Sequence, residues 1–196
     1  MKQTIITHLR ESAELKLRLA KESADVVEDI ANLVIKALKS RGKILLFGNG
    51  GSAADAQHIA AEFINRFQRE RRALPAIALT TDTSIITSIG NDSSFSHIFS
   101  RQIEALGKKG DIAWAISTSG KSRNVISALK TARELGLHTI GFTGQTGDKM
   151  KDLMDLAIQV PSRSTPRIQE VHITVAHIIC ELAEEAFSSA EGSLKR

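Results

Sequence analysis

Short apolar runs recur along this chain and are separated by segments with helical spacing. The runs are continuous rather than alternating, which is typical of strands buried on both faces of a parallel sheet. Turn-forming residues bound most of them, and each has the length of a single strand. They predict five strands, at residues 43–47 (KILLF), 75–79 (PAIAL), 111–116 (DIAWAI), 138–143 (HTIGFT) and 156–160 (LAIQV).

Helical segments lie between these strands and on either side of them. The first is a long stretch without proline or glycine, over residues 3–38. Strand–helix alternation of this kind predicts an α/β fold, a doubly wound five-stranded parallel sheet flanked by helices, with an N-terminal helical arm. No linker or repeat divides the chain, so we expect one domain over 1–196. The other helical segments are 52–66, 84–106 (a helix-rich piece), 122–135, 149–154 and 166–188.

The fold class itself predicts where a ligand binds. In doubly wound sheets, ligands lie beyond the carboxyl ends of the strands, where the following loops gather. That rule selects residues 48–52, 80–92, 117–122 and 143–147 as the lining of a site.

Composition restricts the class of protein and its expected location. Hydrophobic residues make up 42% and charged residues 24%, no apolar run is long enough to span a membrane, and the N-terminus is polar. The single cysteine, Cys180, excludes an internal disulfide and a thiolate metal cage, and it fits a cytoplasmic location. Net charge is only +4 and tyrosine is absent, so we expect no direct nucleic-acid binding. The basic residues concentrate at a predicted helix end, which favours a solvated end or an anion or subunit contact, at Arg66, Arg69, Arg71 and Arg72.

The segment Gly48-Asn49-Gly50-Gly51-Ser52 follows a strand and opens a helix. Glycines let the backbone approach a ligand, and the free N–H groups of a helix N-terminus attract an anion. The spacing matches neither the dinucleotide-binding GxGxxG nor a P-loop. A tight turn without a ligand is the alternative.

A second loop, STSGKS at residues 117–122, occupies the same position after the third strand. An N-cap needs only one hydroxyl, whereas this loop has four, so we favour phosphate binding. The hydroxyl-bearing residues are Ser117, Thr118, Ser119 and Ser122.

His58 and Glu62 are four residues apart and therefore share one face of the second predicted helix. Alone they would suggest a solvated face, because the core side carries Ala56, Ile59, Ala60, Phe63 and Phe67.

The last predicted helix offers a partner pair, Gln169 and His177. Its core stripe is expected at Ile168, Val171, Val175, Ile178, Ile179 and Leu182, with His172 at the edge as a structural residue. A second face is too apolar for open water and suggests contact with another subunit, and it carries Gln169, Ile173, Ala176, His177 and Cys180. The solvent side carries Glu170, Thr174, Glu181 and Glu185.

Two histidines, a glutamate and a glutamine form a plausible Zn²⁺ ligand set: His58, Glu62, Gln169 and His177. The alternative is a metal-free site in which Glu62 and His177 act as acid and base.

At these residues the chain resembles the sugar isomerase (SIS) domain family, which has a flavodoxin-like fold, and within it the phosphoheptose isomerases. The resemblance covers essentially the whole chain, through GNGGS, PAIAL, GND at 90–92, STSG and RIQEVH in order. It implies conversion of sedoheptulose 7-phosphate to D-glycero-D-manno-heptose 7-phosphate, the first step toward the heptose of bacterial lipopolysaccharide. It also implies a homotetramer with active sites between subunits, in which the arm 1–38 would serve oligomerisation.

The resemblance implies a role for each matching position. Glu62 and His177 would carry the proton chemistry, and one zinc ion per subunit would be held by His58, Glu62, Gln169 and His177. The phosphate would contact Ser117, Thr118, Ser119 and Ser122. The sugar would contact Asn49, Gly50, Gly51, Ser52, Glu62, Asn91, Asp92 and Gln169.

One branch of the same family is not enzymatic and binds the bacterial replication initiator protein as a tetrameric regulator. The stretch SAADAQHIAAEFINRFQRERRALPAIAL is similar to that branch. We expect that branch to lack the acid and base, whereas this chain has Glu62 and His177, so the enzyme is the favoured prediction.

Overall fold

The computed structural model describes residues 1–191 and has a single five-stranded sheet at its centre. All neighbouring strands are parallel, in the order β2-β1-β3-β4-β5. This confirms the predicted fold class, including the number of strands. The strands are β1 (Ile44–Gly48), β2 (Ala76–Ala78), β3 (Ile112–Ser117), β4 (His138–Gly144) and β5 (Leu156–Val160).

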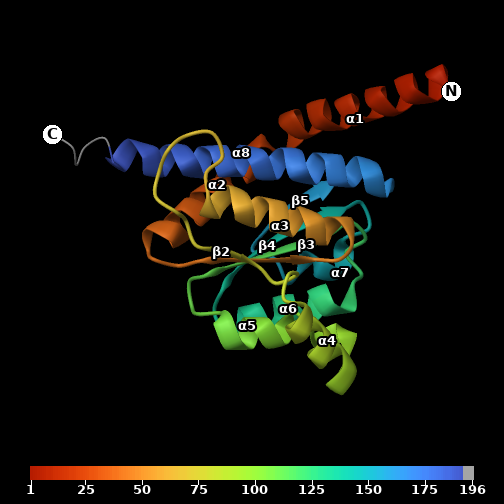
Figure 1. Cartoon of the computed structure of the whole chain (residues 1–196). Coiled ribbons are helices and arrows are strands. Elements are labelled where there is room, and N and C mark those ends of the chain that lie inside the picture. Colours follow the sequence, from red (N-terminus) through yellow and green to blue (C-terminus); the bar gives the residue numbers. More distant parts are fainter. Residues whose placement is uncertain (192–196) are drawn as a thin grey trace.

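Helices cover both faces of the sheet (Figure 1). On one face lie α2 (Ala24–Lys39), α3 (Gly51–Ile64) and α8 (Thr165–Glu191), and α1 (Lys2–Glu22) projects beyond them. The other face carries α4 (Thr83–Asp92), η1 (Phe95–His97), α5 (Ser100–Leu106), α6 (Arg123–Glu134) and α7 (Asp148–Lys151). Within residues 1–191, no helix is both long enough and apolar enough to cross a membrane.

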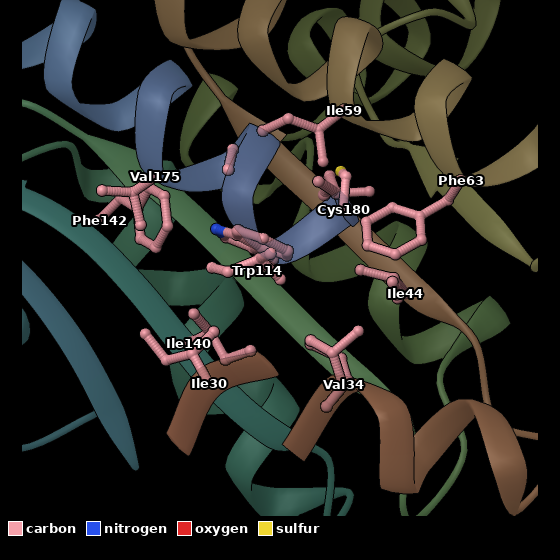
Figure 2. Close-up of a cluster of buried hydrophobic side chains, with 14 of the residues drawn as sticks. Ile30, Val34, Ile44, Ile59, Phe63, Trp114, Ile140, Phe142, Val175 and Cys180 are labelled. Carbon is pink, nitrogen blue, oxygen red and sulfur yellow. The ribbon is translucent and has the colours of Figure 1, made fainter. Parts of the chain in front are cut away.

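Alternate residues of β1 and β3 enter two separate hydrophobic clusters. Trp114 of β3 points toward α2, α3 and α8, whereas its neighbours Ala113 and Ala115 point toward α5 and α6. Figure 2 shows Trp114 at the centre of the first cluster, between Val34 of α2 and Val175 of α8. Burial on both sides explains why the strand sequences are apolar throughout.

The predicted helical stretch over residues 3–38 consists of two helices. α1 and α2 meet at Ser23, whose backbone departs from the helical conformation (φ −137°, ψ 10°). α2 buries a full apolar stripe, but α1 buries only Ser12 and Leu19 and leaves Leu17 72% exposed. The chain therefore bends where its apolar positions stop matching the surface of the domain. No proline or glycine marks this bend in the sequence.

The apolar stripe of α8 is rotated from the predicted one. Ile178 is 42% exposed, whereas Ala176 and Cys180, predicted on a second face, are buried in the core. Small side chains at these two positions let α8 lie close to α3 and the sheet, so they rather than Ile178 form the contact. Glu184, two turns after His177, is also buried.

His172 of α8 is buried, as predicted for a structural residue, and is 1% exposed. Its Nε2 lies 3.1 Å from the carbonyl oxygen of Thr143, while Nδ1 has no hydrogen-bond partner among the described residues. Burial lowers the pKa of His172 to about 4, although the bond to Thr143 opposes the shift. The folded protein therefore holds this imidazole neutral.

We expect acid to destabilise the fold through His172. The unfolded chain binds a proton near the ordinary histidine pKa of about 6.5, but the folded chain does so only near 4, so stability falls as pH drops through this window. Urea unfolding at pH 7 and pH 5 should show a loss of about 2 kcal/mol from this group. His172→Gln keeps a donor for Thr143 without titrating, so its pH dependence should be shallower by that amount. Equal slopes in both proteins would contradict the prediction.

Candidate active site

The turn between β1 and α3 is tied to the start of α6 by a pair of amides. Asn49 Nδ2 donates to Asn124 Oδ1 (2.9 Å), and Asn124 Nδ2 donates back to Asn49 Oδ1 (2.8 Å). Gly50 has φ +57°, a conformation that favours glycine, and Gly51 begins α3. Asn124 is 3% exposed and was not predicted from the sequence, because one asparagine inside a helix carries no recognisable pattern.

The hydroxyl-rich loop after β3 lies beside this turn. Ser117 Oγ and Ser122 Oγ are 3.3 Å apart, and Ser119 Oγ accepts from the N–H of Lys121 (3.2 Å). Gly120 has φ +62° and packs on Gly147 so closely that a Cβ would lie 2.4 Å from the Gly147 Cα. Clefts open on both sides of the loop. One includes Asn49, Phe95 and Ser122, and the other includes Thr118, Ser119, Thr146 and Arg163.

Three of the four predicted metal ligands converge between α3 and α8. His58 Nε2 lies 3.1 Å from Glu62 Oε1 and 3.3 Å from His177 Nε2. One ligand atom from each residue lies within 4.8 Å of the other two. Two imidazole nitrogens and a carboxylate oxygen form a donor set that can hold a divalent cation. We call His58, Glu62 and His177 the triad.

The surroundings of the triad favour a neutral imidazole at His177. Burial lowers the pKa of His177, the nearby His58 lowers it further, and Glu62 opposes both. The ring of Phe67 lies against His177, with centroids 5.3 Å apart. A metal or a proton-transfer reaction needs the free nitrogen lone pair that a neutral imidazole supplies.

Asp55 lies one turn before His58 on α3. Its Oδ2 is buried and has no hydrogen-bond partner among residues 1–191. Burial raises the pKa of Asp55, although His58 opposes the shift.

Gln169, the fourth predicted ligand, lies against the beginning of α3. A Cβ on Gly51 would fall 2.4 Å from Gln169 Nε2, so the absence of a side chain at Gly51 makes room for this amide. Gln169 and His177 are two turns apart on α8, about 12 Å along the helix. The structure thus places Gln169 at the glycine-rich turn and His177 in the triad, and the ligand role of Gln169 stays a prediction.

Asn91 and Asp92 lie on the other face of the sheet from the triad, at the end of α4. Both are exposed, and Asn91 Nδ2 donates to Asp92 Oδ1 (2.8 Å). α4 packs mainly on η1. Their contact with the sugar is therefore still a prediction.

The basic cluster after α3 is only partly a solvated surface. Arg66 and Arg69 are half exposed and pair with Glu70 and Glu185. The Arg71 side chain, in contrast, is 1% exposed and lies beside Glu184. The prediction of a solvated helix end is thus wrong for Arg71, because a buried carboxylate on α8 draws its guanidinium inward.

Comparison with known proteins identifies the family. The SIS domain model matches residues 7–144. The phosphoheptose isomerase of Aquifex aeolicus is 57% identical over 176 residues, which span 90% of this chain and 92% of that protein. That of Roseiflexus sp. (strain RS-1) is 54% identical over 180 residues, 92% of this chain and 91% of that protein.

Solved structures of related proteins have the same fold. The phosphoheptose isomerase of Neisseria gonorrhoeae superposes with a TM-score of 0.89 at 43% identity, over 94% of this chain and 98% of that one. The phosphoheptose isomerase from Francisella tularensis gives a TM-score of 0.90 at 35% identity, over 93% and 97% of the two chains. By sequence and by structure, the chain belongs to the SIS domain family and, within it, to the phosphoheptose isomerases.

Proposed function

We propose that this protein is an aldose–ketose isomerase that converts sedoheptulose 7-phosphate to D-glycero-D-manno-heptose 7-phosphate, the first step toward the heptose of lipopolysaccharide. The observation that carries the proposal is the convergence of Glu62 and His177 between α3 and α8. An acid and a base at one point are what this reaction requires. The relatives that match nearly the whole chain are named phosphoheptose isomerases, and this name indicates a heptose phosphate as the substrate.

Glu62 and His177 would move the protons. Glu62 takes the proton from C1 of the ketose, and the released electron pair forms the C1=C2 bond of a cis-enediol as O2 gains a proton. His177 delivers a proton to C2 from the opposite side, and the O1 proton leaves as the C1 carbonyl forms. The neutral imidazole favoured by the lowered pKa of His177 can accept one proton and donate another.

The triad also fits zinc. Four donors at about 2.0–2.1 Å from a tetrahedral zinc ion lie about 3.3–3.4 Å from one another. The separations of His58 Nε2 from Glu62 Oε1 (3.1 Å) and from His177 Nε2 (3.3 Å) are close to that spacing. We propose one zinc ion per subunit, held by these three residues and Gln169. When bound, it would polarise the sugar carbonyl and stabilise negative charge on oxygen.

The two loops at the carboxyl ends of β1 and β3 would hold the rest of the substrate. The hydroxyl-rich loop binds the phosphate through Ser117, Thr118, Ser119 and Ser122, and this remote binding aligns the reacting carbons. Sugar hydroxyls would contact Asn49, Gly50, Gly51 and Ser52 of the glycine-rich turn, together with Asn91, Asp92 and Gln169.

We further propose a homotetramer of single-domain subunits with active sites between them. The exposed apolar side chains of α1 support it, since Ile5, Leu9 and Leu17 are 57%, 67% and 72% exposed. An apolar groove between α1, α2 and α8 includes Leu19, Val175 and the exposed Ile178. The arm 1–38 would cover such surfaces in neighbouring subunits. The cytoplasmic location stays a prediction from the sequence.

The non-catalytic regulator is not favoured. The regulator hypothesis predicts a site without the acid and the base, whereas Glu62 and His177 lie together in this protein. The matching relatives are also named as isomerases.

The test of function is turnover of sedoheptulose 7-phosphate by purified protein, with and without added Zn²⁺. We expect aldose to appear, with solvent deuterium incorporated at C2 and detected by proton NMR. No exchange and no aldose, in protein that still binds the sugar phosphate, would favour the regulator. Turnover only of a six-carbon ketose phosphate would correct the substrate.

A further inference from the structure

In the segment that follows α3, the side chain of Arg71 makes hydrogen bonds back to the end of that helix. Arg71 Nη2 donates to the carbonyl oxygen of Glu62 (2.6 Å). Its Nη1 donates to the carbonyls of Asn65 (3.0 Å) and Arg72 (2.9 Å). The last carbonyls of a helix have no partner within the helix, so Arg71 caps the turn that carries Glu62.

The same segment is held from the other side by Glu184 of α8. Its Oε1 accepts from the N–H of Phe67 (2.8 Å), and its Oε2 accepts from Gln68 (2.6 Å) and Arg69 (2.8 Å). Burial alone would raise the pKa of Glu184, but these three N–H groups and Arg71 outweigh it and hold that pKa below its ordinary value. Glu184 is therefore an anion in the folded protein.

Arg71 and Glu184 also meet each other. Arg71 Nε lies 3.5 Å from Glu184 Oε1, and both side chains are 1% exposed. The two side chains of this buried ion pair also bond six backbone groups, three carbonyls and three N–H groups. The pair therefore has little freedom to shift, because movement would leave buried polar groups unpaired.

This network spans the two halves of the triad. Arg71 holds the backbone of Glu62 on α3, and Glu184 lies two turns after His177 on α8. Phe67, whose N–H bonds to Glu184, places its ring against His177. The triad depends on a separation of 3.3 Å between His58 Nε2 and His177 Nε2, which lie on helices distant in sequence, and neither helix fixes that separation alone.

We propose that Arg71 and Glu184 are positioning residues that fix Glu62 and His58 at the spacing from His177 needed for metal binding and proton transfer. They touch neither substrate nor metal and act through the backbone of Glu62 and the ring of Phe67. The proposal rests on the proposed function only where it concerns catalysis. The claim that these two residues set the spacing of the triad does not depend on that function.

The test measures both spacing and metal affinity in Arg71→Met, which keeps the side-chain length but removes the charge and the donors. Arg69→Met is the matched control, since it removes an arginine from the same segment that is half exposed and pairs with Glu185. Val34→Ala, in the buried face of α2, controls for a general loss of stability. Glu184→Gln and Arg71→Lys are second variants should Arg71→Met fail to fold.

We expect zinc affinity, from competition with a chromophoric chelator, to fall about 10–100-fold in Arg71→Met and in Glu184→Gln. Arg71→Lys should recover part of the loss, and both controls should stay near wild type. Crystal structures of the metal-free variants should show the His58–His177 Nε2 separation, 3.3 Å here, lengthened by about 1 Å.

Wild-type spacing and wild-type zinc affinity in Arg71→Met or Glu184→Gln would overturn the proposal, as would an equal loss in the controls. Failure of the proposed function is distinguishable. A wild-type protein that binds no zinc and isomerises nothing, while its Arg71 variant still has a widened triad, would remove the function and leave the positioning role standing.

Discussion

Replacing Glu62 with glutamine should lower kcat by at least about 10³-fold while leaving sugar-phosphate binding nearly unchanged. The substitution keeps the shape of the side chain but removes its basicity and its negative charge. Glu62 is the carboxylate of the triad, so the change removes both the proposed base and the anionic metal ligand. The proposed phosphate contacts lie in the loop 117–122, on another element, and should still hold the substrate.

Steady-state kinetics with sedoheptulose 7-phosphate and a separate binding measurement would check this result. Glu104→Gln is the matched control, because it makes the same chemical change at an exposed glutamate that pairs with Arg101. A Glu62→Gln protein with near-normal kcat would remove Glu62 from the proton chemistry. A parallel loss of binding would mean that Glu62 holds the substrate rather than transforming it.

Truncating Trp114 to alanine should lower the free energy of unfolding by about 3–5 kcal/mol. Trp114 is fully buried in the middle strand of the sheet and packs edge-on against Phe142, with ring centroids 5.1 Å apart. Figure 2 shows side chains from α2, α3 and α8 around it. Its removal would leave a cavity beneath the two helices that carry the triad.

Trp114→Phe should cost much less than the alanine variant. The indole Nε1 has no hydrogen-bond partner within the described part of the chain, so the aromatic ring rather than the N–H group makes the contribution. Urea unfolding monitored by far-ultraviolet circular dichroism would measure both variants. Equal losses for Phe and Ala would show that the N–H group is bound, for example to water, and that the packing argument is incomplete.

The strands and the fold class could be predicted because burial on both faces leaves a signature in every strand. β5 was predicted at its observed bounds, 156–160. β2 is shorter than the predicted 75–79, and its middle residue Ile77 is 38% exposed at this edge of the sheet. The bend at Ser23 had no signature, since it depends on which apolar side chains find a partner in the folded domain.

The triad could be predicted in part. Helical spacing brings His58 and Glu62 together, and the pattern of the last predicted helix indicates His177 as a partner, but no spacing rule places two helices side by side. The sequence also shows Arg71 only as one of several arginines near a helix end. Its burial depends on Glu184, which was missed because a lone glutamate on a long helix is normally solvated.

The position of α8 after all five strands has a consequence for biosynthesis. His58 and His177 are 119 residues apart, and a ribosome adding 5–20 residues per second needs about 6–24 seconds to pass from one to the other. During that interval α3 can form on the emerging strands, but its histidine and glutamate face no partner, and the segment after it has no Glu184 to accept its N–H groups. A nascent chain that ends before α8 therefore lacks His177, and the triad is complete only after the final helix has docked.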